Sequence, residues 1–197
     1  MDTLEINQYL KSKIGFRVEY LGIFTSDRLE RLKLKTYREK ASVLIANTLK
    51  ESDDSQLMGH WVSFYVEKSP YDRIIFFDSF GISIELYGNG FQNFIENNEK
   101  FTLYQFNIQY QLSDSYKCGL YAIFFVHYAS LFGLREVIIQ LRNNFSKYNR
   151  SSNDKYVTRY FLRYIGDKSC RKWIDGEQRA ITFKECRKII CMLNKRI

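Results

Sequence analysis

Few residues of this chain belong to the types that most often carry catalysis, bind metals or cross-link small domains. Among 197 residues there is 1 Pro, with 2 His and 4 Cys: His60, His127, Cys118, Cys170, Cys186 and Cys191. The cysteine spacing fits no disulfide framework, so we expect free thiols in a reducing compartment, the cytoplasm or the nucleus. The pair Cys186-x4-Cys191 has no histidine nearby and is poor support for a zinc site. We therefore expect neither a metal nor a cofactor.

Long apolar runs are missing as well. The apolar stretch at 121–126 is far too short to cross a bilayer, and residues 1–5 lack the basic and apolar regions of a signal peptide. No Gly/Ser-rich linker and no internal repeat interrupts the chain. A hydrophobic fraction of 45%, with 16 Phe and 15 Tyr, is typical of a packed globule. We expect a single domain over residues 1–197, a monomer, with no membrane partner.

Positive charge is concentrated in the last third of the chain. Residues 133–197 contain 16 Lys and Arg against 6 Asp and Glu, a net charge of +10, whereas residues 1–132 contain 14 against 16. A field of that sign favours a polyanionic partner. A solvated basic helix face explains the same pattern equally well, so charge alone leaves both readings open.

The hydrophobic pattern predicts both helices and strands. We expect an extended segment at 17–24 and strands at 60–67, 73–78 and 102–111. We expect helices at 2–12, 36–50, 118–132, 134–145 and 155–165, with a basic tail after them. The helix at 118–132 is nearly all apolar, which is typical of a buried central helix.

Cys118 and His60 are the best candidates for a nucleophile and its base. A cysteine attacks as the thiolate, and a helix N-terminus and a neighbouring imidazolium both lower a thiol pKa. Cys118 opens the predicted helix and so meets the first condition by position. His127 lies on the same helix, about 13 Å further along, and cannot reach Cys118 while that helix is intact. His60 is the remaining base.

Three further positions complete a site suited to acyl transfer. If the strands at 60–67 and 73–78 form an antiparallel hairpin, Asp78 lies beside His60 and orients its ring. Gln111 is placed to offer an amide N–H to an oxyanion, with the backbone N–H of Cys118 as the second donor. Gly119 allows a substrate backbone to approach closely.

Each of these residues also has a simpler explanation. Cys118 fits a buried small apolar residue, and His60 fits a packed core residue. Asp78 fits a turn or cap aspartate. Gln111 fits a residue at a strand end, and Gln109 on the same face is an alternative donor. Only the combination of all four groups, in this order, favours chemistry.

Four stretches of the chain resemble the adenovirus-type (adenain-like) cysteine endopeptidases, within the larger group that includes the SUMO-deconjugating proteases. They are GHWVSF at 59–64, FFDSFG at 76–81, Gln111 seven positions before the cysteine, and CGLYAIFFVH at 118–127. The family order is His, acid, Gln, Cys, and adenoviral members usually have Glu where this chain has Asp78. The resemblance implies an α+β fold in which a central helix packs on a mixed β-sheet with flanking helices.

The resemblance also implies a function. His60, Asp78 and Cys118 would form the triad, Gln111 would donate to the oxyanion, and Gly59, Trp61 and Gly119 would border the substrate cleft, although core packing explains Trp61 as well. The substrates would be precursor structural proteins of a virus or virus-like element, cleaved at Gly-containing sites during virion maturation.

Partners and location follow from the same resemblance. DNA would be an activator bound by the basic part at 133–197, and the protein would act in the host nucleus or cytoplasm and in the virion. The chain has no cysteine before Cys118 for a disulfide to an activating peptide. Two alternatives stay open: a protease that removes a ubiquitin-like (SUMO-type) modifier, and a nucleic-acid-binding protein with an idle protease fold.

Overall fold

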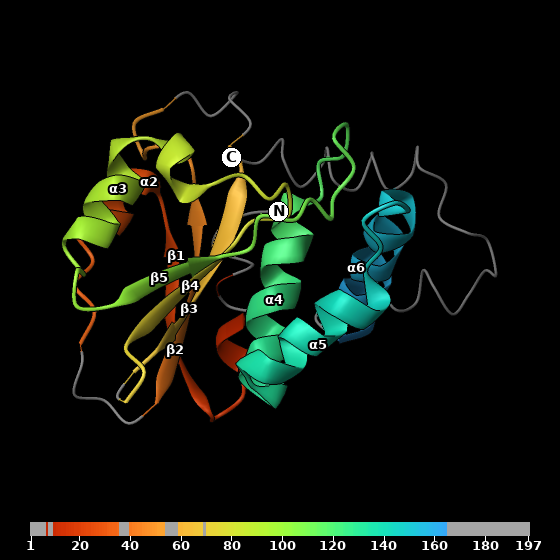
Figure 1. The fold of residues 1–197 in the computed structure, drawn as a ribbon, viewed down its shortest axis with the longest axis horizontal. Coiled ribbons are helices and arrows are strands. Elements are labelled where there is room, and N and C mark those ends of the chain that lie inside the picture. Colours follow the sequence, from red (N-terminus) through yellow and green to blue (C-terminus); the bar gives the residue numbers. More distant parts are fainter. Residues whose placement is uncertain (1–6, 8–9, 36–39, 54–58, 69, 165–197) are drawn as a thin grey trace.

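The chain folds into three layers, with a mixed β-sheet between two groups of helices (Figure 1). The computed structural model describes residues 7, 10–35, 40–53, 59–68 and 70–164. The predicted basic tail and most of the predicted helix at 2–12 lie outside the described residues. No helix within the described part is long and apolar enough to span a membrane.

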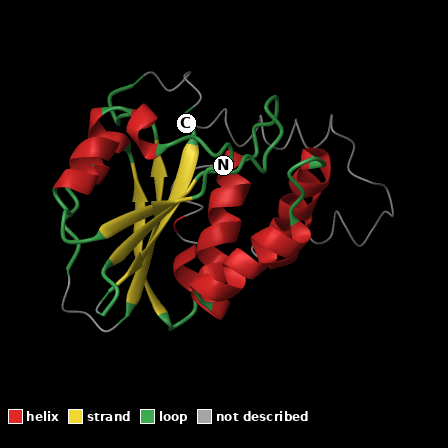
Figure 2. Ribbon diagram, viewed as in Figure 1, coloured by secondary structure: helices red, strands yellow, loops and turns green. Residues whose placement is uncertain are grey.

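The sheet has five strands that follow one another in space as they do in sequence. Figure 2 shows the strands side by side as one sheet with helices on either side. The outer pairs, β1–β2 and β4–β5, are parallel, and the inner pairs, β2–β3 and β3–β4, are antiparallel. The strands are β1 (Val18–Phe24), β2 (Ala41–Asn47), β3 (Trp61–Glu67), β4 (Arg73–Phe77) and β5 (Thr102–Gln105).

Helices cover both faces of this sheet. On one face lie α2 (Ser26–Leu29), the 3-10 helix η1 (Ile84–Tyr87) and α3 (Asn89–Glu96). On the other lie α4 (Cys118–Phe132), α5 (Leu134–Asn144) and α6 (Arg150–Tyr164). Figure 1 shows α4 between the sheet and the other two helices, as expected from its apolar sequence. The predicted α+β fold with a central helix on a mixed sheet is confirmed.

Side-chain alternation along the strands divides the core into two parts. Facing α4 are Val43, Ile45, Tyr65, Ile75 and Phe77. Facing α2 and α3 are Leu44, Phe64, Val66, Ile74 and Phe76. The rings of Phe77 and Phe125 stack at 4.6 Å between centroids and 3° between planes, which fixes α4 against β4. The strand ends that carry the candidate site are therefore anchored to α4.

Three sequence predictions are wrong in whole or in part. The segment 36–50 contains β2 and not a helix. Its run Val43–Ala46 is buried on both faces of the sheet. A strand that is covered on both faces has a continuously apolar sequence, which lacks the alternation expected of a strand. The strand expected at 102–111 ends at Gln105, since β4 ends at Phe77 and offers no further partner. The last described helix begins at Arg150 and not near 155, with the Asn149 side chain accepting from the backbone N–H of Ser152.

Candidate active site

His60 and Asp78 lie side by side at one end of the β3–β4 hairpin. His60 directly precedes β3 and Asp78 directly follows β4, so antiparallel pairing brings together two residues 18 positions apart. His60 Nε2 is 2.5 Å from Asp78 Oδ1. The backbone of His60 is held in turn by Thr48, whose hydroxyl accepts from the His60 N–H at 2.9 Å. The predicted hairpin and its His–Asp contact are confirmed.

Asp78 is fully buried and surrounded by hydrogen-bond donors. Besides His60, its carboxylate accepts from the backbone N–H groups of Phe80 and Ile82, at 3.0 and 2.7 Å, and from the Tyr87 hydroxyl at 2.8 Å. Both oxygens are engaged, so the carboxylate cannot rotate without losing bonds. It therefore presents Oδ1 to the imidazole in a fixed position.

Two aromatic rings hold the imidazole in addition to the carboxylate. The His60 ring stacks on Phe80 at 4.9 Å between centroids and on Tyr87 at 5.7 Å. Tyr87 thus touches both His60 and Asp78, a role that the sequence analysis missed. Tyr87 lies in η1, and no apolar periodicity in the sequence predicts that helix. Only the reversal of the chain after Asp78 brings Tyr87 back to the site.

Cys118 is the first residue of α4, is half-buried and is a free thiol. Burial alone would lower the pKa of His60, but hydrogen bonds to Asp78 and Cys118, together with their charges, raise it to about 9. His60 therefore interacts with both partners. Because Nε2 faces Asp78, Nδ1 is the ring nitrogen left for the thiol.

Gln111 is fully buried and sits on the segment that leads into the loop before Cys118. Its Oε1 accepts from the Ser79 hydroxyl at 2.7 Å, and its Nε2 donates to the backbone carbonyl of Ser115 at 2.5 Å. The side-chain NH₂ group of the alternative residue, Gln109, donates to the Gln111 backbone carbonyl and to the Ser113 hydroxyl. Gln111 is thus attached to Ser79, the neighbour of Asp78, while its role as an oxyanion donor stays a prediction.

Three residues are expected at the substrate cleft. Gly119 and Trp61 lie against each other, and packing explains the glycine at position 59. A Cβ at Gly119 would lie 3.4 Å from Cδ1 of Trp61, so the start of α4 rests on the indole. A Cβ at Gly59 would overlap the side-chain amide of Asn47, which accounts for glycine there without a substrate. Contact of any of them with substrate stays a prediction.

The second histidine is a core residue. His127 is buried in α4, and its Nδ1 lies 2.7 Å from the Tyr160 hydroxyl. Burial, with a smaller effect from the charge of Lys13, lowers the pKa of His127 to about 4. It is therefore neutral at neutral pH and connects α4 to α6.

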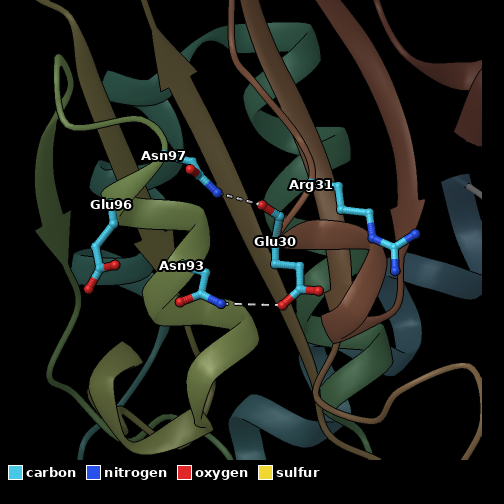
Figure 3. A pocket seen from close by; sticks show the side chains of 5 residues that line it. All are labelled: Glu30, Arg31, Asn93, Glu96 and Asn97. Carbon is cyan, nitrogen blue, oxygen red and sulfur yellow. Dashed lines mark hydrogen bonds between the residues drawn. The ribbon is translucent and has the colours of Figure 1, made fainter.

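A cavity of about 410 Å³ lies away from these residues, at the ends of α2 and α3 (Figure 3). Figure 3 shows its polar lining, in which the Asn93 and Asn97 side chains donate to the Glu30 carboxylate and backbone carbonyl. It contains none of the candidate site residues. Within the described part of the chain, no group of three or more His, Cys, Asp and Glu is placed to hold a metal ion.

Comparisons with known proteins find likenesses among solved structures alone. No protein-family model matches the chain, and no curated protein matches it. Among solved structures, the chain is similar to the C-terminal Ulp1 protease domain in complex with SMT3, the yeast ortholog of SUMO. The identity is 14%, over 81% of this chain and 77% of that one, with a TM-score of 0.40.

Proposed function

We propose that this protein is a cysteine peptidase whose nucleophile is Cys118. The observation that carries the proposal is the position of His60, held by Asp78 on one side and interacting with Cys118 on the other, with a pKa raised to about 9. At neutral pH such a histidine is protonated and stabilises a thiolate. A packed core histidine has the opposite behaviour, as the lowered pKa of His127 illustrates.

In the proposed mechanism, the Cys118 thiolate attacks the carbonyl carbon of the scissile bond and the π electrons move to the oxygen. The oxyanion is stabilised by the Gln111 amide and the Cys118 backbone N–H. As the tetrahedral intermediate collapses, the C–N bond breaks and the His60 imidazolium gives its proton to the leaving amine. His60, now neutral, takes a proton from water, and the hydroxide adds to the thioester carbonyl. The C–S bond then breaks, which releases the carboxylic acid and regenerates the Cys118 thiolate beside the protonated His60. Asp78 keeps the imidazole oriented throughout.

The proposed substrates are proteins with glycine near the scissile bond. The resemblance to adenain-like enzymes, including the seven-residue spacing from Gln111 to Cys118, favours precursor structural proteins of a virus or virus-like element. A protease that removes a ubiquitin-like modifier is compatible with the same residues. We propose the host nucleus or cytoplasm, and the virion, as the places of action.

The substrate proposal is tested with two kinds of probe. An internally quenched peptide with Gly-Gly on the acyl side of the scissile bond should be cleaved by the wild type and not by Cys118→Ala. Electrophilic probes built on ubiquitin and SUMO should leave Cys118 unlabelled if precursor cleavage is the activity, whereas labelling would favour deconjugation. Equal peptide cleavage by Cys118→Ala would refute the peptidase itself.

DNA is proposed as an activator that binds the basic helices. Residues 133–164 carry 7 Lys and Arg against 2 acidic residues, and one of those two, Asp154, is buried. The surface of α5 and α6 is therefore more positive than the sequence count suggests. Binding to duplex DNA should weaken steeply with salt if phosphates are contacted, and a flat salt dependence would dismiss this role.

A further inference from the structure

Ser79 is joined to Gln111 by both its side chain and its backbone. The Ser79 hydroxyl lies 2.7 Å from Gln111 Oε1, and the Ser79 carbonyl accepts from the backbone N–H groups of Tyr110 and Gln111, at 2.8 and 3.0 Å. Ser79 is 1% exposed and Gln111 is fully buried, so water does not compete for these bonds. The residue that follows Asp78 in sequence thus holds the residue expected to face the oxyanion.

The two partners of the Gln111 side chain determine which end of the amide points where. The Ser115 backbone carbonyl can only accept, so the amide atom 2.5 Å from it must be the NH₂ group. Oε1 then faces Ser79, whose hydroxyl must act as the donor. A rotation of the amide by half a turn would set two oxygens against each other at Ser115.

We propose that Ser79 is a positioning residue that fixes the Gln111 amide so that an N–H, and never the oxygen, is offered to the oxyanion. This inference rests on the proposed peptidase function. Nε2 carries two protons, and Ser115 takes only one of them. The second is free for the developing negative charge, whereas an amide oxygen in its place would repel that charge. Without the Ser79 hydroxyl, the buried Oε1 of Gln111 loses its hydrogen-bond donor. The bond from Nε2 to the Ser115 carbonyl then remains as the restraint on the amide.

The first measurement needs no substrate. In two-dimensional ¹⁵N–¹H spectra, the Gln111 side-chain NH₂ signals are assigned by their loss in Gln111→Ala. In the wild type they should exchange slowly with solvent, because the group is buried on both sides. In Ser79→Ala they should shift and exchange faster. Unchanged Gln111 signals in Ser79→Ala would overturn the inference, even in a chain that cleaves nothing.

The second measurement is kinetic and uses the quenched Gly-Gly peptide. Removing an oxyanion donor costs about 10²–10³ in kcat, so Gln111→Ala should lose that much and Ser79→Ala about tenfold or more, with KM unchanged. Because Ser79 acts through Gln111, adding Ser79→Ala to Gln111→Ala should change kcat by less than about twofold. A further tenfold loss in the double variant would instead show an independent effect and contradict the inference.

A matched control and one more readout separate this role from a structural one. Ser63 is a buried serine of β3 whose hydroxyl has no hydrogen-bond partner among the described residues, so Ser63→Ala should leave the peptide kinetics within about twofold. The rate of Cys118 alkylation by iodoacetamide should be the same in Ser79→Ala as in the wild type, since the thiolate does not need Gln111. Should Ser79→Ala unfold, Ser79→Cys is similar in size, is a poor donor and should show the same loss.

Failure of the proposed function would look different. If the wild type itself shows ordinary thiol reactivity at Cys118 and no cleavage, the peptidase proposal fails. If the wild type is active, Gln111→Ala is impaired and Ser79→Ala is not, only the role of Ser79 fails.

Discussion

The Tyr87 hydroxyl donates a hydrogen bond of 2.8 Å to Oδ2 of Asp78, the carboxylate oxygen that His60 does not use. The same tyrosine ring lies 18° from parallel to the imidazole of His60. One side chain therefore restrains both members of the His–Asp pair. The two contacts can be separated by mutation. Tyr87→Phe keeps the ring contact with His60 and loses the hydrogen bond to Asp78.

Tyr87→Phe should lower kcat for the quenched peptide by about three- to tenfold, with KM unchanged. The loss corresponds to one hydrogen bond of about 0.5–1.5 kcal/mol that orients Asp78. Tyr87→Ala should lose more, because the ring contact with His60 disappears as well. Tyr148→Phe is the control, since Tyr148 is 99% exposed and its side chain makes no described contact with His60 or Asp78. Equal kcat values for Tyr87→Phe and the wild type would show that the hydroxyl does not act on the site.

Protein stability should fall with rising pH in a window set by His60. Its pKa is raised from 6.5 in the unfolded chain to about 9 in the folded protein, so the folded state binds the proton more tightly. The resulting stabilisation is fully present below pH 6.5 and is lost as pH rises through about 9. The shift corresponds to roughly 3 kcal/mol at most. Urea unfolding between pH 6 and pH 9.5 measures it.

The control for this pH effect is His60→Ala, in which the slope of the free energy of unfolding over that window should be much smaller. The wild type and His60→Ala should thus converge as pH rises. Because the Cys118 thiol ionises in the same pH range, the comparison is repeated in a Cys118→Ala background. Parallel curves there, with and without His60→Ala, would mean that the pKa of His60 is not raised by folding.

Gly81 should be intolerant of a side chain. Its φ of +68° is unfavourable for other residues, and an added Cβ would lie 2.7 Å from the backbone of Ile108. Gly88 has a φ of +82° and a ψ of −174°, a conformation that residues with a side chain rarely adopt, and no described atom lies within 4 Å of an added Cβ. Gly88→Ala therefore measures a backbone cost alone, about 1–3 kcal/mol. Gly81→Ala should destabilise by clearly more in urea unfolding, and it should reduce activity because residues 106–110 lead to Gln111. Equal losses in the two variants would contradict this account.

The parts of the site that the sequence reveals are those tied to regular elements. Alternation of Val62, Phe64 and Val66 predicts the strand after His60, and all three do lie on one face. The apolar stretch after Cys118 predicts α4. These patterns report on burial, which a single sequence encodes directly.

The features that the sequence did not predict depend on loop conformation and on which faces of the sheet the helices cover. The β2 run Val43–Ala46 suits a buried helix as well as a strand, and only the helices on both faces of the sheet decide between them. The contacts of Ser79 with Gln111 and of Tyr87 with Asp78 join segments 32 and 9 positions apart through irregular backbone. No periodicity predicts such contacts.

The measurement that tests the central claim most directly is the pH dependence of iodoacetamide alkylation at Cys118, followed by mass spectrometry, in the wild type and in His60→Ala. Free glutathione serves as the reference thiol. If His60 and Cys118 form a thiolate–imidazolium pair, Cys118 reacts well below the pH of about 8.5 at which an ordinary thiol ionises, and His60→Ala abolishes this early reactivity. A Cys118 profile that follows glutathione, or one that is the same in both proteins, would contradict the account.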